Sequence, residues 1–278
     1  MREIRAVSCR SLRLKESFLL KDGGVVSLVG AGGKTSLMFR LARELSEEGA
    51  SVLTATTTRI RKPSWEQSRH VIWADSPDDL ARRAKKILKK SPHVSAGSGP
   101  GSMERPGKLT GFSPEFIDEV AATGLFKWII IEADGAAMKP IKAPAPHEPV
   151  IPSSSEWIIG VLGLKNIGKP LAEAHVFRSR LFGRLSGLAP GDPVSGESAA
   201  VSIVHEKGIM KGAPARAVKI AFLNMAGDPQ RLETGRRVCA AMARMKGRVP
   251  DRAVIGQALG NPPAARIYDF NPGRRHDG

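Results

Sequence analysis

The stretch VVSLVGAGGKTSLMF, residues 25–39, passes from an apolar run through a cluster of glycines into an amphipathic segment. The apolar run predicts a buried β-strand, and the helical spacing of apolar residues after Lys34 predicts an α-helix. Glycines at positions 30, 32 and 33 allow the turn between them to adopt positive φ angles and to approach a ligand closely. The stretch therefore predicts a strand–turn–helix unit of an α/β protein.

The rest of the chain continues this alternation of apolar runs and amphipathic segments. Such alternation predicts right-handed βαβ units, and thus an α/β fold with a mainly parallel sheet and helices on both faces. Residues 165–214 are expected to form a helical insertion within a single domain of residues 1–278. Further strands are expected within residues 50–58, 93–97, 126–135, 155–164, 215–225 and 251–259, the last two of these being the final strands, and further helices within residues 76–90, 113–124 and 228–247.

The glycine-rich turn is typical of a phosphate-binding loop at the N-terminus of a helix. The long motif G-x-x-x-x-G-K-[ST] would need a glycine at Leu28, so only a short form is present, with a spacing similar to that of Mur-type ligases. Lys34, expected to be exposed, would bridge the terminal phosphates, and the Thr35 hydroxyl would bind Mg²⁺. A plain glycine-rich turn is the alternative. The predicted nucleotide-binding residues of this loop are Gly30, Ala31, Gly32, Gly33, Lys34, Thr35 and Ser36.

Two carboxylates follow the apolar run WIII, as Glu132 and Asp134 in the sequence EADG. A P-loop enzyme needs an acid at the end of a nearby buried strand to hold Mg²⁺. The E-x-x-G arrangement resembles metal-cofactor maturation GTPases, which implies a metal-linked Glu132 and a Gly135 N–H that faces the γ-phosphate. If the strand continued, the two acids would lie on opposite faces, so Glu132 is expected to be the metal-side acid. Lys34, Glu132 and Asp134 are the catalytic candidates, and a solvated Asp-Gly turn is the alternative.

Threonines end the predicted strand in TATTTRI, residues 54–60. In switch-type sites a threonine at this place closes on Mg²⁺ or the γ-phosphate, which makes Thr57 a candidate metal ligand and the neighbouring Arg59 a candidate substrate or partner contact. Threonine is also common in strands simply because it is β-branched.

A proline-rich segment, KPIKAPAPHEPVIP, covers residues 139–152 and holds five prolines in fourteen residues. Such a segment cannot be helical and must follow an extended path. Lys139, Lys142, His147 and Glu148 are candidate contacts to a second substrate or a partner, since lysine suits an anion and His/Glu suit proton transfer or metal binding. An ordinary loop histidine is the alternative for His147. His175 and Arg178 are compatible with a substrate contact and equally with a surface helix.

The net charge of +16 favours anionic partners such as a nucleotide. The basic run of residues 81–90 is expected to be a solvated helix face rather than a nucleic-acid site, because aromatic residues do not interleave with it. No apolar run approaches the roughly 20 residues needed to cross a membrane. Cys9 and Cys239 form no disulfide framework, and the N-terminus lacks an apolar signal core, so a cytoplasmic location is expected.

Taken together, LVGAGGKTSLMFRLA, TATTTRI, IIIEADGAAMKPIKAPAPHEPVIP, GLKNIGKPL and ALGNPPAARIY resemble the YqeC family. This resemblance spans about residues 25–268 and implies a P-loop NTPase-like fold and a protein that binds nucleoside triphosphate. Family members are regarded as factors for selenium cofactor biosynthesis, accessory to selenium-dependent molybdenum hydroxylases. The implied cofactors are Mg²⁺ and ATP or GTP. The implied partners are a selenium-containing or molybdenum-cofactor-related acceptor and a client hydroxylase.

Guanine-specific GTPases carry N-K-x-D at the end of a late strand. Here Asn224 is followed by Met225 in place of lysine, and Asp228 comes four residues after Asn224 instead of three. Asn224 and Asp228 remain candidate nucleotide contacts, but the departure leaves ATP and GTP equally open.

Three functions stay open at this point. The first is an enzyme or switch that hydrolyses a nucleotide or uses it to activate an acceptor. The second is a nucleotide-gated, metallochaperone-like binding protein without a reaction of its own. The third is a basic nucleic-acid-binding protein.

Overall fold

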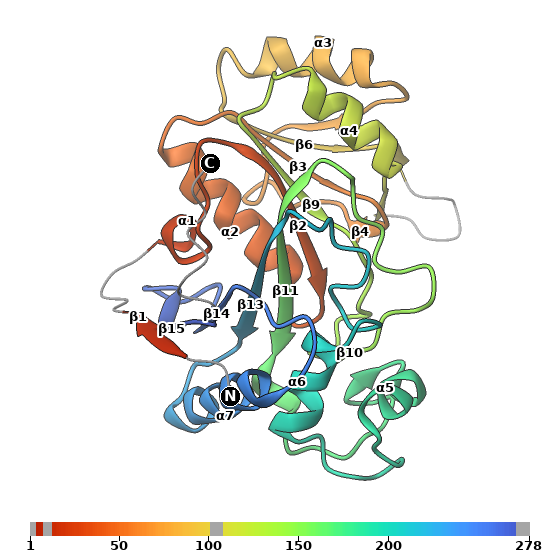
Figure 1. Ribbon diagram of the computed structural model, residues 1–278. Helices are drawn as coiled ribbons and strands as arrows, with labels where there is room; N and C mark the ends of the chain where they lie inside the picture. The colour runs from red at the N-terminus through yellow and green to blue at the C-terminus, as the bar shows by residue number, and fades with distance from the viewer. Residues whose placement is uncertain (1–3, 8–12, 101–107, 271–278) are drawn as a thin grey trace.

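The computed structural model describes residues 4–7, 13–100 and 108–270 of the chain. A large sheet forms the centre of the described part, with helices on both sides (Figure 1). Eight of its strands are mutually parallel, while β15 pairs antiparallel with β14, and β1 with β15. From edge to edge the order is β1 (Arg5–Val7), β15 (Ala264–Asp269), β14 (Arg252–Gly256), β13 (Val218–Asn224), β11 (Ser155–Gly163), β2 (Gly24–Gly30), β9 (Trp128–Glu132), β3 (Val52–Thr56), β6 (His93–Gly97) and β5 (Val71–Trp73).

Both faces of this sheet are buried under helices. In β9, Ile129 and Ile131 enter one hydrophobic core while Trp128 and Ile130 enter the other, as the alternation of a strand requires. α1 (Leu14–Ser17) and α2 (Lys34–Glu47) contribute to the second core. The first core takes side chains from α3 (Pro77–Ile87), α4 (Pro114–Ala122), α6 (Gly196–Val204) and α7 (Pro229–Arg244). The expected α/β architecture is confirmed.

Local signals set several helix boundaries. The Ser76 hydroxyl accepts a hydrogen bond from the Asp79 N–H, and Ser113 does the same for Phe116, so both Ser-Pro helix starts are confirmed. In α3, Leu80 and Ala84 are buried, so the basic run is a solvated face as expected. The exposed basic residues of this helix are Arg82, Arg83, Lys85 and Lys86.

One prediction for the sheet was wrong, and one edge strand was missed. Residues 251–259 do not hold the last strand, because β15 follows and returns antiparallel beside β14. The three-residue edge strand β5 was not predicted, since VIW is too short to show a period. Smaller pairings complete the described structure: β4 (Arg59–Arg61) and β7 (Gly99–Pro100) with β8 (Lys108–Thr110), and β10 (Ile141–Lys142) with β12 (Val176–Phe177).

The expected helical insertion holds η1 (Leu164–Asn166), α5 (Ser179–Ser186) and α6, and it also contains β12, although no clear strand was predicted there. Pairing of β12 with β10 attaches it to the proline-rich segment. α5 lies beside β10 in Figure 1 and packs against α6. A separate small core is formed by Ile141, Ala143, Leu171, Val176, Phe182 and Val194.

No helix in the described ranges has the length and apolar character that a membrane span requires. Cys239 is buried in α7, and burial raises the pKa of its thiol to about 12. Cys9 lies outside the described residues.

Candidate functional site

The glycine-rich turn lies at the carboxyl end of β2, where the chain changes direction across the sheet. β9 and β3 lie on one side of β2, and β11 lies on the other. In open α/β sheets, ligands bind in the crevice outside the carboxyl ends of the strands at such a switch point. The turn is therefore placed where this architecture binds ligands.

Close packing explains the glycines of the turn. Gly32 and Gly33 have φ values of 94° and 108°, which disfavour any side chain. A Cβ atom on Gly32 would also lie 2.4 Å from the Gly163 nitrogen, and one on Gly33 would lie 2.6 Å from Asn224 Nδ2. α2 begins immediately afterwards at Lys34, so the N-terminus of the helix adjoins the turn.

Asn224, at the end of β13, fixes this turn from the side. Its buried amide donates to the Gly32 carbonyl at 2.7 Å and accepts from the Ala258 N–H at 2.9 Å. Asp228 has a different environment. Its carboxylate caps α7 by accepting from the Arg231 N–H at 2.8 Å. Of the two expected base contacts, the structure brings only Asn224 to the glycine-rich turn.

Lys34 is buried, with 3% of its surface exposed, so the expectation of an exposed loop lysine was wrong. Its ammonium group donates to the Gly30 carbonyl at 2.7 Å and lies 3.2 Å from Asp134 Oδ1 and 3.6 Å from Glu132 Oε1. Burial alone would lower the pKa of Lys34, but the attraction of Asp134 and Glu132 outweighs it and raises the pKa above its ordinary value. Lys34 is therefore held as a cation between two carboxylates.

The two acids meet at this lysine instead of lying on opposite faces. β9 ends at Glu132, so the condition for opposite faces, a strand that continues to Asp134, is not met. Glu132 Oε2 accepts from the Thr35 hydroxyl at 2.7 Å. Asp134 is fully buried, and its Oδ2 accepts from the Gly30 N–H at 3.0 Å. Among the described residues, Asp134 Oδ1 has no hydrogen-bond partner.

Lys142 and Glu148, expected to contact a substrate or partner, are buried in ion pairs with other protein groups. Lys142 Nζ donates to Asp134 Oδ2 at 2.8 Å and to Glu148 Oε2 at 2.7 Å. Arg178 then donates to both oxygens of Glu148, at 2.5 and 3.0 Å. Burial would raise the pKa of Glu148, but hydrogen bonds and charges of Arg178 and Lys142 lower it to about 2.

These contacts join the glycine-rich turn to the insertion through charged side chains. We call the set the ion-pair network. It consists of Lys34, Glu132, Asp134, Lys142, Glu148 and Arg178. Sequence analysis left the role of Arg178 open, because its partner is thirty residues away and no spacing connects them.

The other candidates lie around this network with mixed outcomes. Thr57 donates its hydroxyl to the Val150 carbonyl at 2.6 Å, so it ties β3 to the proline-rich segment. Lys139 donates to the Ala174 carbonyl at 2.8 Å. Arg59 and His147 are exposed, and His175 is half-buried. The Thr57 hydroxyl thus bonds to a backbone carbonyl, and this contact does not place it beside Glu132 or Asp134 as a metal ligand.

Oxygen ligands for a cation do converge in this place. Within residues 4–7, 13–100 and 108–270, no three His, Cys, Asp or Glu side chains gather as a metal cluster. Mg²⁺ does not need one, because it binds through one or two carboxylates together with waters and phosphates. Glu132, Asp134 and the Thr35 hydroxyl fit that requirement, and Asp134 Oδ1, which accepts no hydrogen bond among the described residues, lies 3.2 Å from the Lys34 ammonium group.

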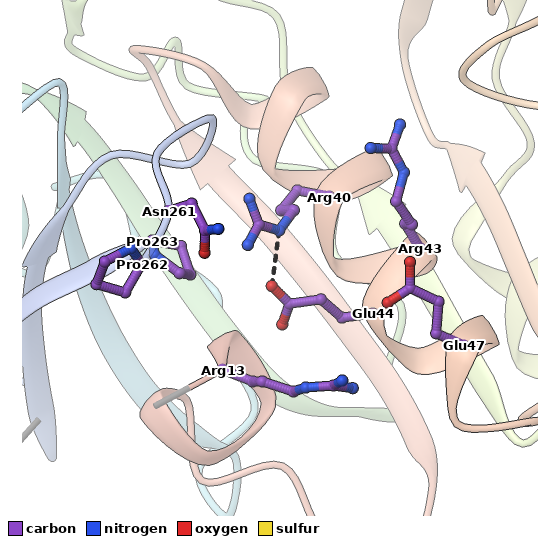
Figure 2. Close-up of a pocket in the computed structure, with 8 residues that line it drawn as sticks. All are labelled: Arg13, Arg40, Arg43, Glu44, Glu47, Asn261, Pro262 and Pro263. Atoms are coloured by element: carbon purple, nitrogen blue, oxygen red, sulfur yellow. Dashed lines mark hydrogen bonds and ion pairs between the residues drawn. The ribbon is translucent and has the colours of Figure 1, made fainter. Parts of the chain in front are cut away.

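A separate hollow of about 580 Å³ lies on the outer side of α2 (Figure 2). Glu44 is held there by Arg40 at 2.7 Å and by the Leu14 N–H at 2.8 Å. The lining residues are Arg13, Arg40, Arg43, Glu44, Glu47, Asn261, Pro262 and Pro263, none of which belongs to the glycine-rich turn or the ion-pair network.

Comparison with known proteins shows which family this chain resembles. A family model described as "YqeC protein" matches residues 26–180, more than half of the chain. The chain belongs to the YqeC family. The family match includes both ends of the ion-pair network, Lys34 and Arg178, whereas Asn224 lies outside it. "Uncharacterized protein YqeC" of Escherichia coli (strain K12) is 35% identical over 208 residues, which are 72% of this chain and 75% of that protein.

Proposed function

We propose that this protein binds a nucleoside triphosphate with Mg²⁺ at the glycine-rich turn, in the manner of a P-loop NTPase. The observation that carries the proposal is the buried Lys34 at the N-terminus of α2, held between Glu132 and Asp134 beside a turn that only glycine can form. Backbone N–H groups and a helix N-terminus stabilise phosphate, and the lysine adds a positive charge.

In this proposal the turn binds the phosphates and Lys34 moves from the Gly30 carbonyl towards them. Glu132, Asp134 and Thr35 hold the metal ion. Bound Mg²⁺ neutralises charge on the terminal phosphates during phosphoryl transfer. Asn224 keeps the turn in place through the Gly32 carbonyl.

The nucleotide base stays open between adenine and guanine. Asp228 caps α7 with a carboxylate that is 42% exposed, and Met225 stands in place of the lysine of the guanine motif. We therefore propose weak discrimination between ATP and GTP.

Two modes of use fit this site. In the first, the protein hydrolyses the nucleotide or uses it to activate an acceptor held by the proline-rich segment. In the second, the nucleotide gates binding of a partner, and the ion-pair network that reaches the insertion favours this mode. Nucleic-acid binding has less support, because Arg82 and Arg83 of α3 pair with Asp79 on a solvated face.

The accessory role in selenium cofactor biosynthesis, or in maturation of selenium-dependent molybdenum hydroxylases, rests on the family resemblance. We include it in the proposal on that basis. Its test is the activity of a client hydroxylase in cells that lack this protein, with restoration by the wild-type chain and not by a Glu132→Gln variant.

Nucleotide binding is tested first by thermal unfolding of the wild-type protein with Mg²⁺ and a panel of nucleoside triphosphates. A ligand at a hundred times its Kd stabilises the folded state by about 2.7 kcal/mol. We expect triphosphates to raise the Tm, and the matching nucleosides, which lack phosphate, to leave it unchanged. No shift with any triphosphate, with or without Mg²⁺, would overturn the proposal.

A further inference from the structure

Arg178 is joined to the glycine-rich turn only indirectly. Two buried side chains, those of Glu148 and Lys142, connect it to Asp134 beside the turn. Arg178 binds both oxygens of Glu148, Glu148 binds Lys142, and Lys142 binds Asp134. The side chains of Lys142 and Asp134 have no exposed surface. Charges buried in this way interact strongly, because little water screens them.

The charges of the network are balanced. Three cations, Lys34, Lys142 and Arg178, face three carboxylates, Glu132, Asp134 and Glu148. Lys142 is shared between Asp134 and Glu148, at 2.8 and 2.7 Å. The partner of Glu148 therefore decides how much of the Lys142 charge is left for Asp134.

Triphosphate binding makes this sharing important. When Lys34 turns to the phosphates, Asp134 loses the cation that lies 3.2 Å from its Oδ1. Lys142 then remains as the protein cation in contact with Asp134. If Glu148 drew Lys142 away, Asp134 would hold Lys34 more strongly, and Lys34 would be less available to the phosphates.

We propose that Arg178 is a positioning residue for the triphosphate site. By neutralising Glu148, it keeps Lys142 on Asp134 and leaves Lys34 free to bind phosphate. This inference rests on the proposed nucleotide binding. It also gives the insertion a part in the site, because Arg178 immediately precedes α5.

The local structure holds Arg178 firmly in this position. Its φ of 58° is left-handed, a backbone conformation that is unfavourable for a residue other than glycine. Its backbone N–H donates to Glu173 at 2.9 Å, and its guanidinium group lies 4.4 Å from the centre of the Phe177 ring. Strain of this kind persists only where surrounding contacts impose it, and it is common at functional sites.

The test is a double-mutant cycle on the full chain, read out as the Kd for Mg²⁺-bound ATP and GTP by calorimetry. Arg178→Met is expected to weaken binding roughly tenfold, or about 1.4 kcal/mol, through the network. Adding Glu148→Gln removes the carboxylate that competes for Lys142, so the double variant recovers most of the lost affinity. Arg180→Met is the matched control, because Arg180 is an exposed arginine in the first turn of α5, two residues after Arg178.

The outcomes separate this inference from the proposed function. If the wild-type protein binds neither triphosphate, both are overturned. If the wild type binds but Arg178→Met binds equally well, or Arg180→Met is weakened as much, the inference alone fails. It also fails if Glu148→Gln deepens the defect of Arg178→Met.

A second readout needs no nucleotide. The Gly30 N–H donates to Asp134, so Arg178→Met is expected to speed hydrogen exchange at Gly30, while Arg180→Met leaves it unchanged. Should Arg178→Met fail to fold, Arg178→Gln replaces it. Glutamine removes the charge and keeps a polar group beside Glu148, so the account predicts changes in the same direction. Unchanged exchange and affinity in a folded Arg178→Gln would then overturn the inference.

Discussion

Replacing Lys34 with methionine keeps an unbranched side chain of nearly the same length and removes the ammonium group between Glu132 and Asp134. Both carboxylates remain buried, with 9% and 0% of their side-chain surfaces exposed. We expect the variant to be less stable than the wild type as well as unable to bind triphosphate. An exposed lysine would affect binding alone, so the loss of stability tests the buried geometry.

Removing one partner of a buried ion pair costs about 3–5 kcal/mol. Each kcal/mol shifts the Tm of a chain of this size by about 2–4 °C, so the Tm should fall by about 6–20 °C. Millimolar Mg²⁺ should restore part of this loss in the variant, because a divalent cation can take the place of the ammonium group between the carboxylates.

Thermal and urea unfolding measure this change directly, with Lys86→Met as the control, since Lys86 is exposed on α3. A Lys34→Met variant as stable as Lys86→Met would refute the paired, buried position of Lys34.

Three further predictions concern other residues of the site. Glu132→Gln should retain nucleotide binding but lose Mg²⁺-dependent hydrolysis. If a hydrolysis assay shows normal activity in Glu132→Gln and none in Asp134→Asn, Asp134 rather than Glu132 is the essential metal ligand. Arg178→Met should reduce the free energy of unfolding by its largest amount above about pH 4.5, and the reduction should shrink as the pH falls towards 2. The reason is that the folded-state pKa of Glu148 is about 2, below its ordinary value. Chemical unfolding across this pH range measures whether the reduction shrinks in that direction. Asp228→Ala should cost about 1 kcal/mol of stability through loss of the α7 cap and leave the ratio of ATP to GTP affinity unchanged, whereas a changed ratio in calorimetry would show that Asp228 contacts the base.

The local units of this fold were predictable from sequence. The strand–turn–helix unit around the glycines, the serine caps at Ser76 and Ser113, and the position of Glu132 at the end of a buried strand follow from short-range rules. Each depends on residues a few positions apart, whose geometry is set by the backbone of one element.

The pairing of charges across the site was not predictable. Lys34 is held in a buried position because the end of β9 and the loop after it bring two carboxylates to it. Arg178 reaches Glu148 because β12 pairs with β10. The antiparallel β15 was missed for a similar reason, since its short sequence AARIYD gains its regular structure from pairing with β14 and β1. Such contacts depend on how distant segments meet, which no spacing in the sequence records.

The most direct measurement of the central claim is calorimetric titration of the wild-type protein and of Lys34→Met with a non-hydrolysable triphosphate and Mg²⁺. The account predicts saturable one-to-one binding to the wild type, and affinity weaker by about a hundredfold or more in the variant, or roughly 2.7 kcal/mol. Equal affinities for the two proteins, or no binding to the wild type, would contradict a phosphate site at the glycine-rich turn.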